Sequence, residues 1–230
     1  MIDCYLNWST GKDACLTLHL LQESKDYRVK KLLTTCNNKL QRVTMHGLSL
    51  ALYNEQISAI NLPAHQIFLD DDISMEAYQN KMEEACLMLK NEGLEHAAFG
   101  DIFLEDLRAY RDKQLGKIGI KTLYPLWKKD SAEVAKQIIA AGIKAIVVCI
   151  NGSLLDKSFC GRLYDEKFLE DLPENVDPCG ENGEFHTFCY DGPMFKHPVA
   201  FTKGNIKTSH YKNPDGSDKE LPFHFQELHV

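Results

Sequence analysis

The chain has 230 residues, of which 44% are hydrophobic and 26% are charged, as is usual for a globular protein. Its net charge of −7 and its isoelectric point near 5.7 provide no general attraction to nucleic acids or to anionic membranes. No apolar run approaches the roughly 20 residues that span a bilayer, and the start MIDCYLNWS lacks the features of a signal peptide. We therefore expect a cytoplasmic protein with no membrane partner and no strong nucleic-acid signal.

The eight cysteines are spread along the chain without a C-x-x-C pair, which argues against a zinc ribbon or a thioredoxin-type motif. Several of them lie in apolar runs, such as Cys149 in AIVVCI. Reduced and buried thiols that pack as small hydrophobic groups are therefore expected.

The predicted elements alternate between strand and helix along the first two thirds of the chain. Strands are predicted over residues 2–6, 29–36, 65–69, 97–99, 118–124 and 145–150. Helices are predicted from the apolar spacing that begins at Ala14, and over residues 47–60, 75–91, 102–115 and 131–141. Such alternation is typical of an α/β fold with a Rossmann-like parallel sheet and helices on both of its faces.

The alternation ends after about Asn151, where glycine, proline and aspartate become frequent, and the tail from Thr202 is polar. We expect this tail to be irregular. The sequence therefore predicts a first domain over 1–128 and a smaller, less regular C-terminal α/β unit over 129–230. The boundary between the two is predicted near residues 127–130.

Residues 9–13, STGKD, follow the first predicted strand and precede an apolar pattern of helical spacing. Ligands of parallel sheets bind at the carboxyl ends of strands, and a helix N-terminus offers amide donors and a partial positive charge. Gly11 allows close approach of the backbone and Lys12 adds a full charge, so this segment suits phosphate. The alternative is a tight turn in which Asp13 stabilises the first helical turn. Neither the Walker pattern nor the dinucleotide fingerprint is present.

The same segment resembles the S-G-G-K-D-S loop of the PP-loop ATP pyrophosphatases, which split ATP between its α and β phosphates. The resemblance implies ATP binding by Ser9, Thr10, Gly11, Lys12, Asp13 and Ala14. It also implies catalytic roles for Lys12 and Asp13, and Mg²⁺ binding by Asp13. Thr10 stands where the family has glycine and Ala14 where it has serine, so the loop departs from the pattern at two positions.

Two further stretches resemble one branch of that superfamily, the diphthine–ammonia ligases. CGENGEFHTFCYDGPMF, residues 179–195, is similar to their C-G-E-G-G-E-Y-E-T signature and the D-x-P-L-F that follows it. FGDIFLEDLR, residues 99–108, and LYPLW, residues 123–127, are similar to their G-A-I-x-S-x-Y-Q-R and Y-L-W. The correspondence is collinear over residues 2–195.

The remaining candidate site residues follow from these stretches and from their own chemistry. ATP contacts are expected from His46, Gly47, Gly100 and Asp101. Substrate contacts are expected from Arg108, Gly180, Glu181, Asn182, Gly183 and Thr187. Catalytic roles are expected for Glu184 and His186, and Glu181 is expected to share Mg²⁺ with Asp13.

Most of these assignments have an ordinary structural alternative. Asp101 is also a plausible N-cap for the helix predicted from Ile102. Arg108 and Arg111 lie on one helical face and suit phosphate or carboxylate, or else a solvated surface. His46 is equally a surface histidine, and the 180–184 segment is equally a solvated acidic hairpin.

Several positions depart from the ligase signatures. Asp101 replaces alanine, His186 replaces glutamate and Asn182 replaces glycine, and the residues before Arg108 also differ. We therefore expect the scaffold and the ATP site to be shared with the ligases more closely than the acceptor site.

The resemblance implies an ATP-dependent amide ligase that adenylates a carboxylate and transfers ammonia to it, with release of AMP and pyrophosphate. Residues 1–128 would bind the nucleotide and 129–230 would lie on the substrate side. The acceptor would be a small-molecule or protein-borne carboxylate. Two alternatives remain, a nucleotide-binding module without turnover and a tRNA-modifying PP-loop enzyme. A homodimer stays open beside a monomer.

Overall fold

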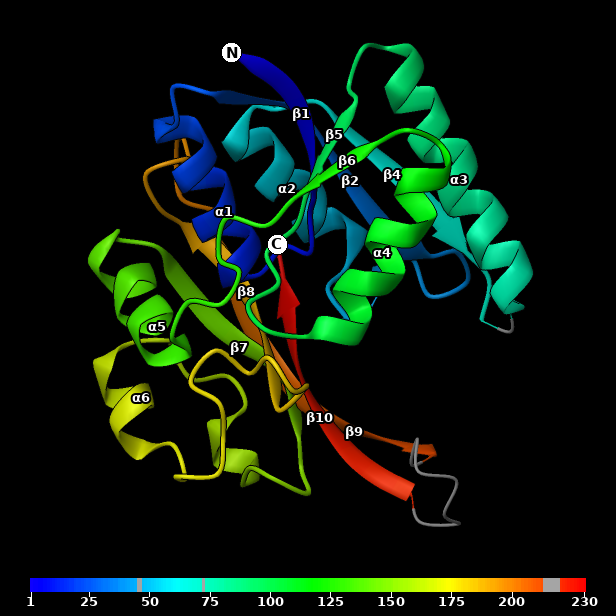
Figure 1. Cartoon of the computed structure of the whole chain (residues 1–230). Coiled ribbons are helices and arrows are strands. Elements are labelled where there is room, and N and C mark those ends of the chain that lie inside the picture. Colours follow the sequence, from blue (N-terminus) through cyan, green and yellow to red (C-terminus); the bar gives the residue numbers. More distant parts are fainter. Residues whose placement is uncertain (45–46, 72, 213–219) are drawn as a thin grey trace.

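A mostly parallel sheet organises the N-terminal half of the computed structural model, which describes residues 1–44, 47–71, 73–212 and 220–230 (Figure 1). Its strands are β1 (Ile2–Asn7), β2 (Tyr27–Asn37), β3 (Arg42–Val43), β4 (Ala64–Leu69), β5 (His96–Ala98) and β6 (Lys121–Leu123). β1 is central and pairs in parallel with β2 and β5, while the short β3 runs antiparallel to β2. The chain winds from β1 through β2 to β4 and then returns past β1 to β5, so the direction of winding reverses between β1 and β5.

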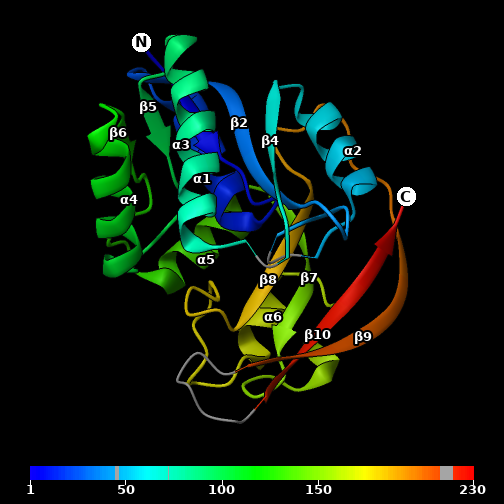
Figure 2. The same ribbon diagram turned by 90° about the vertical axis from the view of Figure 1, so that its right-hand side faces the viewer.

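Helices cover both faces of this sheet because alternate residues of its strands are apolar on opposite faces (Figure 2). The helices are α1 (Lys12–Glu23), α2 (Leu50–Ile60), α3 (Met75–Asn91) and α4 (Glu105–Lys117). Leu6 packs into the core that contains α1 and α2, whereas its neighbour Tyr5 packs with Cys86 and Leu115 of α3 and α4. The predicted Rossmann-like sheet with helices on both faces is therefore confirmed.

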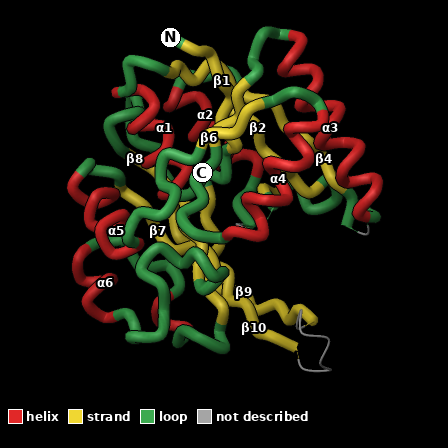
Figure 3. Tube along the Cα trace, in the orientation of Figure 1, coloured by secondary structure: helices red, strands yellow, loops and turns green. Residues whose placement is uncertain are grey.

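A second, antiparallel sheet follows, and Figure 3 shows its strands beneath the first sheet. Its strand order is β8-β7-β10-β9, with β7 (Lys144–Asn151), β8 (Phe185–Asp191), β9 (Thr202–Lys212) and β10 (Glu220–His229). α5 (Ser131–Ala140), α6 (Glu166–Asp171) and a 3₁₀ turn (Lys157–Phe159) accompany it. Val147 and Phe188 of this sheet belong to the same core as Leu6 and Leu16, so the second sheet packs on the α1 side of the first.

Three expectations about elements are wrong. The tail from Thr202 is not irregular, because β9 and β10 form a long antiparallel hairpin and β10 also pairs with β7. The helix predicted over 102–115 begins only at Glu105 and extends to Lys117. The helix predicted from residue 47 begins at Leu50, where the Ser49 hydroxyl accepts a hydrogen bond from the Leu52 amide.

The surroundings of the cysteines and the lengths of the helices can be compared with what the sequence predicts. All eight cysteines are buried and free of disulfides. Across residues 1–44, 47–71, 73–212 and 220–230, no helix is both long and apolar enough to cross a bilayer. Along the sequence, the strands of the first sheet precede residues 127–130 and those of the second sheet follow them. The predicted boundary between two domains at this point stays a prediction.

We expect Leu6→Ala to lower the free energy of unfolding by about 2–5 kcal/mol, because this fully buried side chain would leave a cavity beneath α1. Leu40→Ala is the matched control, since Leu40 is 59% exposed and should change stability by less than about 0.5 kcal/mol. Urea unfolding followed by circular dichroism measures both. Equal stability of the two variants would contradict the assignment of Leu6 to the core.

Candidate active site

A cavity of about 740 Å³ opens at the carboxyl ends of β1 and β5, where the winding of the sheet reverses. Residues of all three motifs line it. The predicted site residues that line it are Ser9, Lys12, Asp13, Ala14, Gly100, Asp101, Gly180, Glu181, Asn182, Gly183, His186 and Thr187. Segments that are far apart in the sequence therefore meet around one space that can hold a ligand.

The loop before α1 adopts a backbone conformation that favours glycine. Thr10 has a φ of +75°, in the left-handed region that a β-branched residue rarely enters. Its carbonyl accepts hydrogen bonds from the Cys189 amide (3.0 Å) and from Gln56 Nε2 (3.0 Å). The Thr10 hydroxyl is buried and has no hydrogen-bond partner among the described residues. This chain thus keeps the loop shape that suits the family's glycine, at a cost in strain.

Gln56 of α2 is a residue that sequence reasoning missed. Its side chain is completely buried, and its Oε1 accepts a hydrogen bond from Trp8 Nε1 (2.9 Å). Its Nε2 donates to the carbonyls of Thr10 (3.0 Å) and Cys189 (2.7 Å). One amide thus joins the end of β1, the loop and β8. The available signal was a glutamine on the otherwise apolar face of α2, but no motif marks it.

Lys12 connects the loop to the C-terminal motif. Its backbone amide donates to Thr187 Oγ1 (3.1 Å), and its ammonium donates to Asp13 Oδ2 (2.8 Å) and to the Cys179 carbonyl. The ammonium also lies 5.3 Å from the centre of the Phe185 ring. Burial alone would lower the pKa of Lys12, but the Asp13 carboxylate and other anionic neighbours outweigh burial and raise that pKa. Lys12 therefore stays charged although it is buried.

The turn before β8 is held together by Glu184. The carboxylate of Glu184 is buried and accepts hydrogen bonds from the Asp177 amide (3.0 Å), the Asn182 amide (2.9 Å) and Asn182 Nδ2 (3.0 Å). Glu184 does not line the cavity, whereas His186, two residues later, does. The geometry therefore favours a positioning role for Glu184 over the predicted contact with reacting groups.

The end of β5 touches the loop directly. A Cβ on Gly100 would lie 3.0 Å from the carbonyl carbon of Asp13, so any larger residue would require the backbone of the loop to shift. The amides of Ile102 and Phe103 donate to Glu181 Oε1 at 2.7 and 3.4 Å. The expected N-cap role of Asp101 is therefore wrong: α4 begins later, and Asp101 instead accepts a hydrogen bond from Arg111.

Glu181 has an unusual environment. Burial raises the pKa of its carboxyl group to about 7, and the nearby charges of Asp13 and Asp101 add to this effect, while the hydrogen bond from the Ile102 amide opposes it. Glu181 is thus influenced by two other acidic side chains, Asp13 and Asp101, and both Asp13 and Glu181 act on the ammonium of Lys12.

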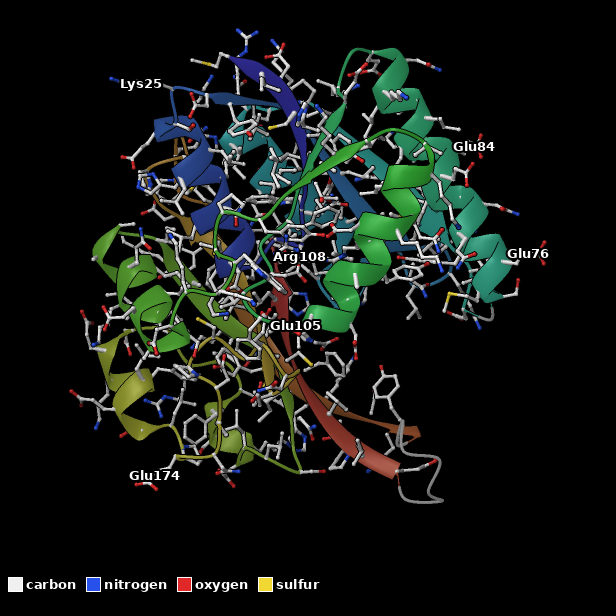
Figure 4. All side chains as sticks on the ribbon, in the orientation of Figure 1. Lys25, Glu76, Glu84, Glu105, Arg108 and Glu174 are labelled. Carbon is white, nitrogen blue, oxygen red and sulfur yellow. The ribbon has the colours of Figure 1, made fainter. Side chains whose placement is uncertain are left out.

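The two arginines of α4 have different surroundings. The Arg108 guanidinium lies 4.5 Å from the Trp127 ring centre and 4.7 Å from that of Tyr124, and it pairs with Asp112 at 3.4 Å. Figure 4 labels Arg108 near Glu105, at the N-terminal end of α4. Arg108 lines a separate hollow of about 250 Å³ and does not line the 740 Å³ cavity of the other candidate residues. Arg111 lines that cavity instead.

Neither residue 46 nor residue 47, which were predicted to contact ATP, is placed at the cavity by the structure. His46 lies outside the described residues. Gly47 has a φ of +64° and does not line the cavity; a Cβ there would approach the Phe225 ring at 3.1 Å. Val43 and Thr44, just before it, do line the cavity.

The residues predicted to hold Mg²⁺ fit a small oxygen-preferring ion. Asp13 and Glu181 both line the cavity, and their carboxyl groups interact electrostatically. Mg²⁺ keeps several waters and needs only one or two protein carboxylates. Within the part of the chain that the structure describes, no group of three or more His, Cys, Asp or Glu side chains is arranged for a metal. The two carboxylates therefore suit Mg²⁺, whereas structural zinc sites are built mainly from cysteine and histidine.

Known proteins are similar to this chain along both units. Residues 130–213 match the family model of the diphthamide synthase C-terminal domain. The diphthine–ammonia ligase of Schizosaccharomyces pombe is 25% identical over 163 residues, which are 68% of this chain and 26% of that protein. The mouse and human diphthine–ammonia ligases are 26% and 24% identical over 67% and 70% of this chain, and 59% and 61% of their own lengths.

The chain therefore spans about a quarter of the fission-yeast relative and about three fifths of the mammalian ones. The matches extend beyond the short motifs, and the family model covers the turn and β8, which complete the cavity. The resemblance suggested by the motifs is confirmed, and the chain is a distant relative of the diphthine–ammonia ligases.

Proposed function

We propose that this chain is an ATP-dependent ligase that adenylates a carboxylate and then transfers ammonia to it. The observation that carries this proposal is the convergence of the loop at residues 9–14, the end of β5 and the 179–187 segment on one cavity. The relatives named diphthine–ammonia ligase support the reaction class. ATP would bind through the loop, and the acceptor would lie nearer to β5 and the turn.

The reaction divides into two steps. A carboxylate oxygen attacks the α-phosphorus of ATP, the bond from that phosphorus to the bridging oxygen breaks, and pyrophosphate leaves. Ammonia then attacks the acyl carbon, the bond from that carbon to the AMP oxygen breaks, and a proton is released. The products are an amide, AMP and pyrophosphate. Activation is needed because a carboxylate does not react with ammonia directly at a useful rate.

Each side chain contributes what its position allows. The buried ammonium of Lys12 offsets negative charge at the phosphates, and it is already oriented by Asp13 and the Cys179 carbonyl. Asp13 and Glu181 would hold Mg²⁺, which supplies further positive charge at the phosphates when bound. His186 lines the cavity, and an imidazole can accept the proton lost from ammonia near neutral pH.

The direct test incubates the protein with ATP, Mg²⁺, ammonium and a panel of carboxylic acids, and identifies the products. We expect AMP and pyrophosphate in equal amounts, with release stimulated by at least one acid. A nucleotide-binding module would bind ATP without turnover, and a tRNA-modifying enzyme would respond to tRNA in place of an acid. Formation of ADP would contradict adenylation.

We expect Lys12→Ala to weaken ATP binding about tenfold or more, because a charge-assisted contact of roughly 1.5–3 kcal/mol is lost. Lys136→Ala is the control, since the Lys136 side chain is 69% exposed and pairs with Glu133 on the surface of α5. Calorimetric titration with ATP measures both variants, and thermal melting checks that they are folded. Equal affinity in wild type and Lys12→Ala would remove the loop from the ATP site.

We expect Thr10→Gly to raise the free energy of unfolding by about 1 kcal/mol, because glycine adopts a φ of +75° without strain and the unpaired buried hydroxyl is removed. Thr10→Ala should gain less, since alanine keeps the strained φ. Combining Thr10→Gly with Ala14→Ser restores the family loop and should keep or tighten ATP binding. Weaker ATP binding by that double variant would show that this loop holds phosphate differently.

A further inference from the structure

An ion pair between Asp101 and Arg111 forms part of the cavity wall between β5 and α4. The Asp101 side chain is 12% exposed and that of Arg111 is 27% exposed. The guanidinium of Arg111 also lies 4.5 Å from the centre of the Phe99 ring. The aspartate is particular to this chain relative to the ligase signature, where alanine precedes the isoleucine.

This ion pair lies beside the phosphate loop. Gly100, the residue before Asp101, packs against the backbone of Asp13. The carboxyl group of Glu181, which lines the same cavity, is influenced electrostatically by both Asp13 and Asp101. An acceptor carboxylate has to reach the α-phosphate of an ATP bound at this loop. Asp101 and Arg111 therefore border the place where the acceptor must lie.

The charge of the cavity makes a cation at this place necessary. Asp13, Glu83, Asp101 and Glu181 all line the cavity and would repel an incoming carboxylate. Among the Lys and Arg side chains on the described cavity wall, Lys12 already bonds Asp13 and the Cys179 carbonyl. Lys117 lies in the last turn of α4 and donates to Gln114.

Arg111 can accept a second carboxylate. Its guanidinium carries five N–H donors, and the bond to Asp101 comes from Nη1. Guanidinium groups bind carboxylates in a bidentate manner, which sets the orientation of the bound group as well as its affinity. The carboxylate of an acceptor can therefore share Arg111 with Asp101 or take its place.

The space next to Arg111 limits the rest of the acceptor. α3 and α4 lie side by side on the same face of the sheet in Figures 1 and 2. Between them the cavity wall is mixed. Tyr78 and Met82 of α3 and Leu107 and Tyr110 of α4 are apolar or aromatic, and polar or charged side chains of the same helices also line it, namely Gln79, Asn80, Glu83, Gln114 and Lys117. The apolar and aromatic members offer contact to an apolar or aromatic body of an acceptor.

We propose that Arg111 binds the carboxylate of the acceptor, with Asp101 as its counter-ion in the empty site, and that the acceptor is a carboxylic acid with an apolar or aromatic body. The inference rests on the proposed ligase function and names the substrate class of that site. Arg111 orients one carboxylate oxygen toward the α-phosphorus, and Asp101 keeps the guanidinium in place until the acid enters.

The test measures pyrophosphate release against acid concentration at saturating ATP and ammonium, with acetate, hexanoate, benzoate, phenylacetate and aspartate as the acids. Arg111→Gln should raise the KM for the best acid about tenfold or more and leave the Kd for ATP unchanged. Arg111→Lys keeps the positive charge but cannot bind a carboxylate in a bidentate manner. Its KM for the acid should therefore lie between those of wild type and Arg111→Gln. Asp101→Asn should lower the KM for the acid, because a competing carboxylate is removed.

The chain offers a matched control in Arg162. This arginine pairs with Asp171, its side chain is also 27% exposed, and its guanidinium lies 5.1 Å from the Phe159 ring centre. It lies outside the cavity. Arg162→Gln should therefore reproduce any general loss of stability, measured by thermal melting, without the change in KM.

The outcomes separate the two proposals. If an acid stimulates the wild type but the KM of Arg111→Gln stays within about twofold of Arg162→Gln, the role of Arg111 is overturned while the ligase function stands. If aspartate is the best acid, the apolar substrate class is overturned. If no free acid stimulates release of pyrophosphate, the proposed class of apolar small acids is overturned, while the ligase function with a protein-borne carboxylate stands.

Discussion

The loop at residues 9–13 keeps its shape because a distant part of the chain holds it. The Thr10 carbonyl accepts a hydrogen bond from the Cys189 amide. The Lys12 amide donates to the Thr187 hydroxyl, and the Lys12 ammonium donates to the Cys179 carbonyl. Gln56 adds a buried amide that joins this loop to β8. Thr187 and Cys189 belong to β8 of the second sheet, Cys179 to the turn before it and Gln56 to α2, so the phosphate loop depends on both halves of the fold.

This dependence explains how the loop tolerates an unfavourable residue. A threonine at positive φ costs free energy, and its buried hydroxyl adds to that cost. Two donors, the Cys189 amide and the Gln56 side chain, bond the Thr10 carbonyl and hold this peptide in place. A buried Lys12 is likewise kept charged by Asp13 and the carbonyl beside it. The shape of the loop is therefore set by contacts within the protein.

The sequence predicts the parallel sheet well because strands buried on both faces are continuous apolar runs, and the three motifs locate the cavity. It predicts β9 poorly, because this edge strand is polar and Ile206 is its main apolar contact. The alternating Leu221, Phe223 and Phe225 of β10 did carry a strand signal. Arg108 and Arg111 could not be separated by helical spacing, since their partners Trp127 and Asp101 come from different loops.

Isotope transfer from the acceptor to AMP tests the central claim, adenylation of a carboxylate in this cavity, most directly. The best-stimulating acid is supplied with both carboxylate oxygens as ¹⁸O, together with ATP and ammonium, and the AMP is analysed by mass spectrometry. Attack by the carboxylate on the α-phosphorus predicts AMP that carries one ¹⁸O from the acid. Unlabelled AMP would mean that water, and no carboxylate, attacks ATP, and it would contradict the account.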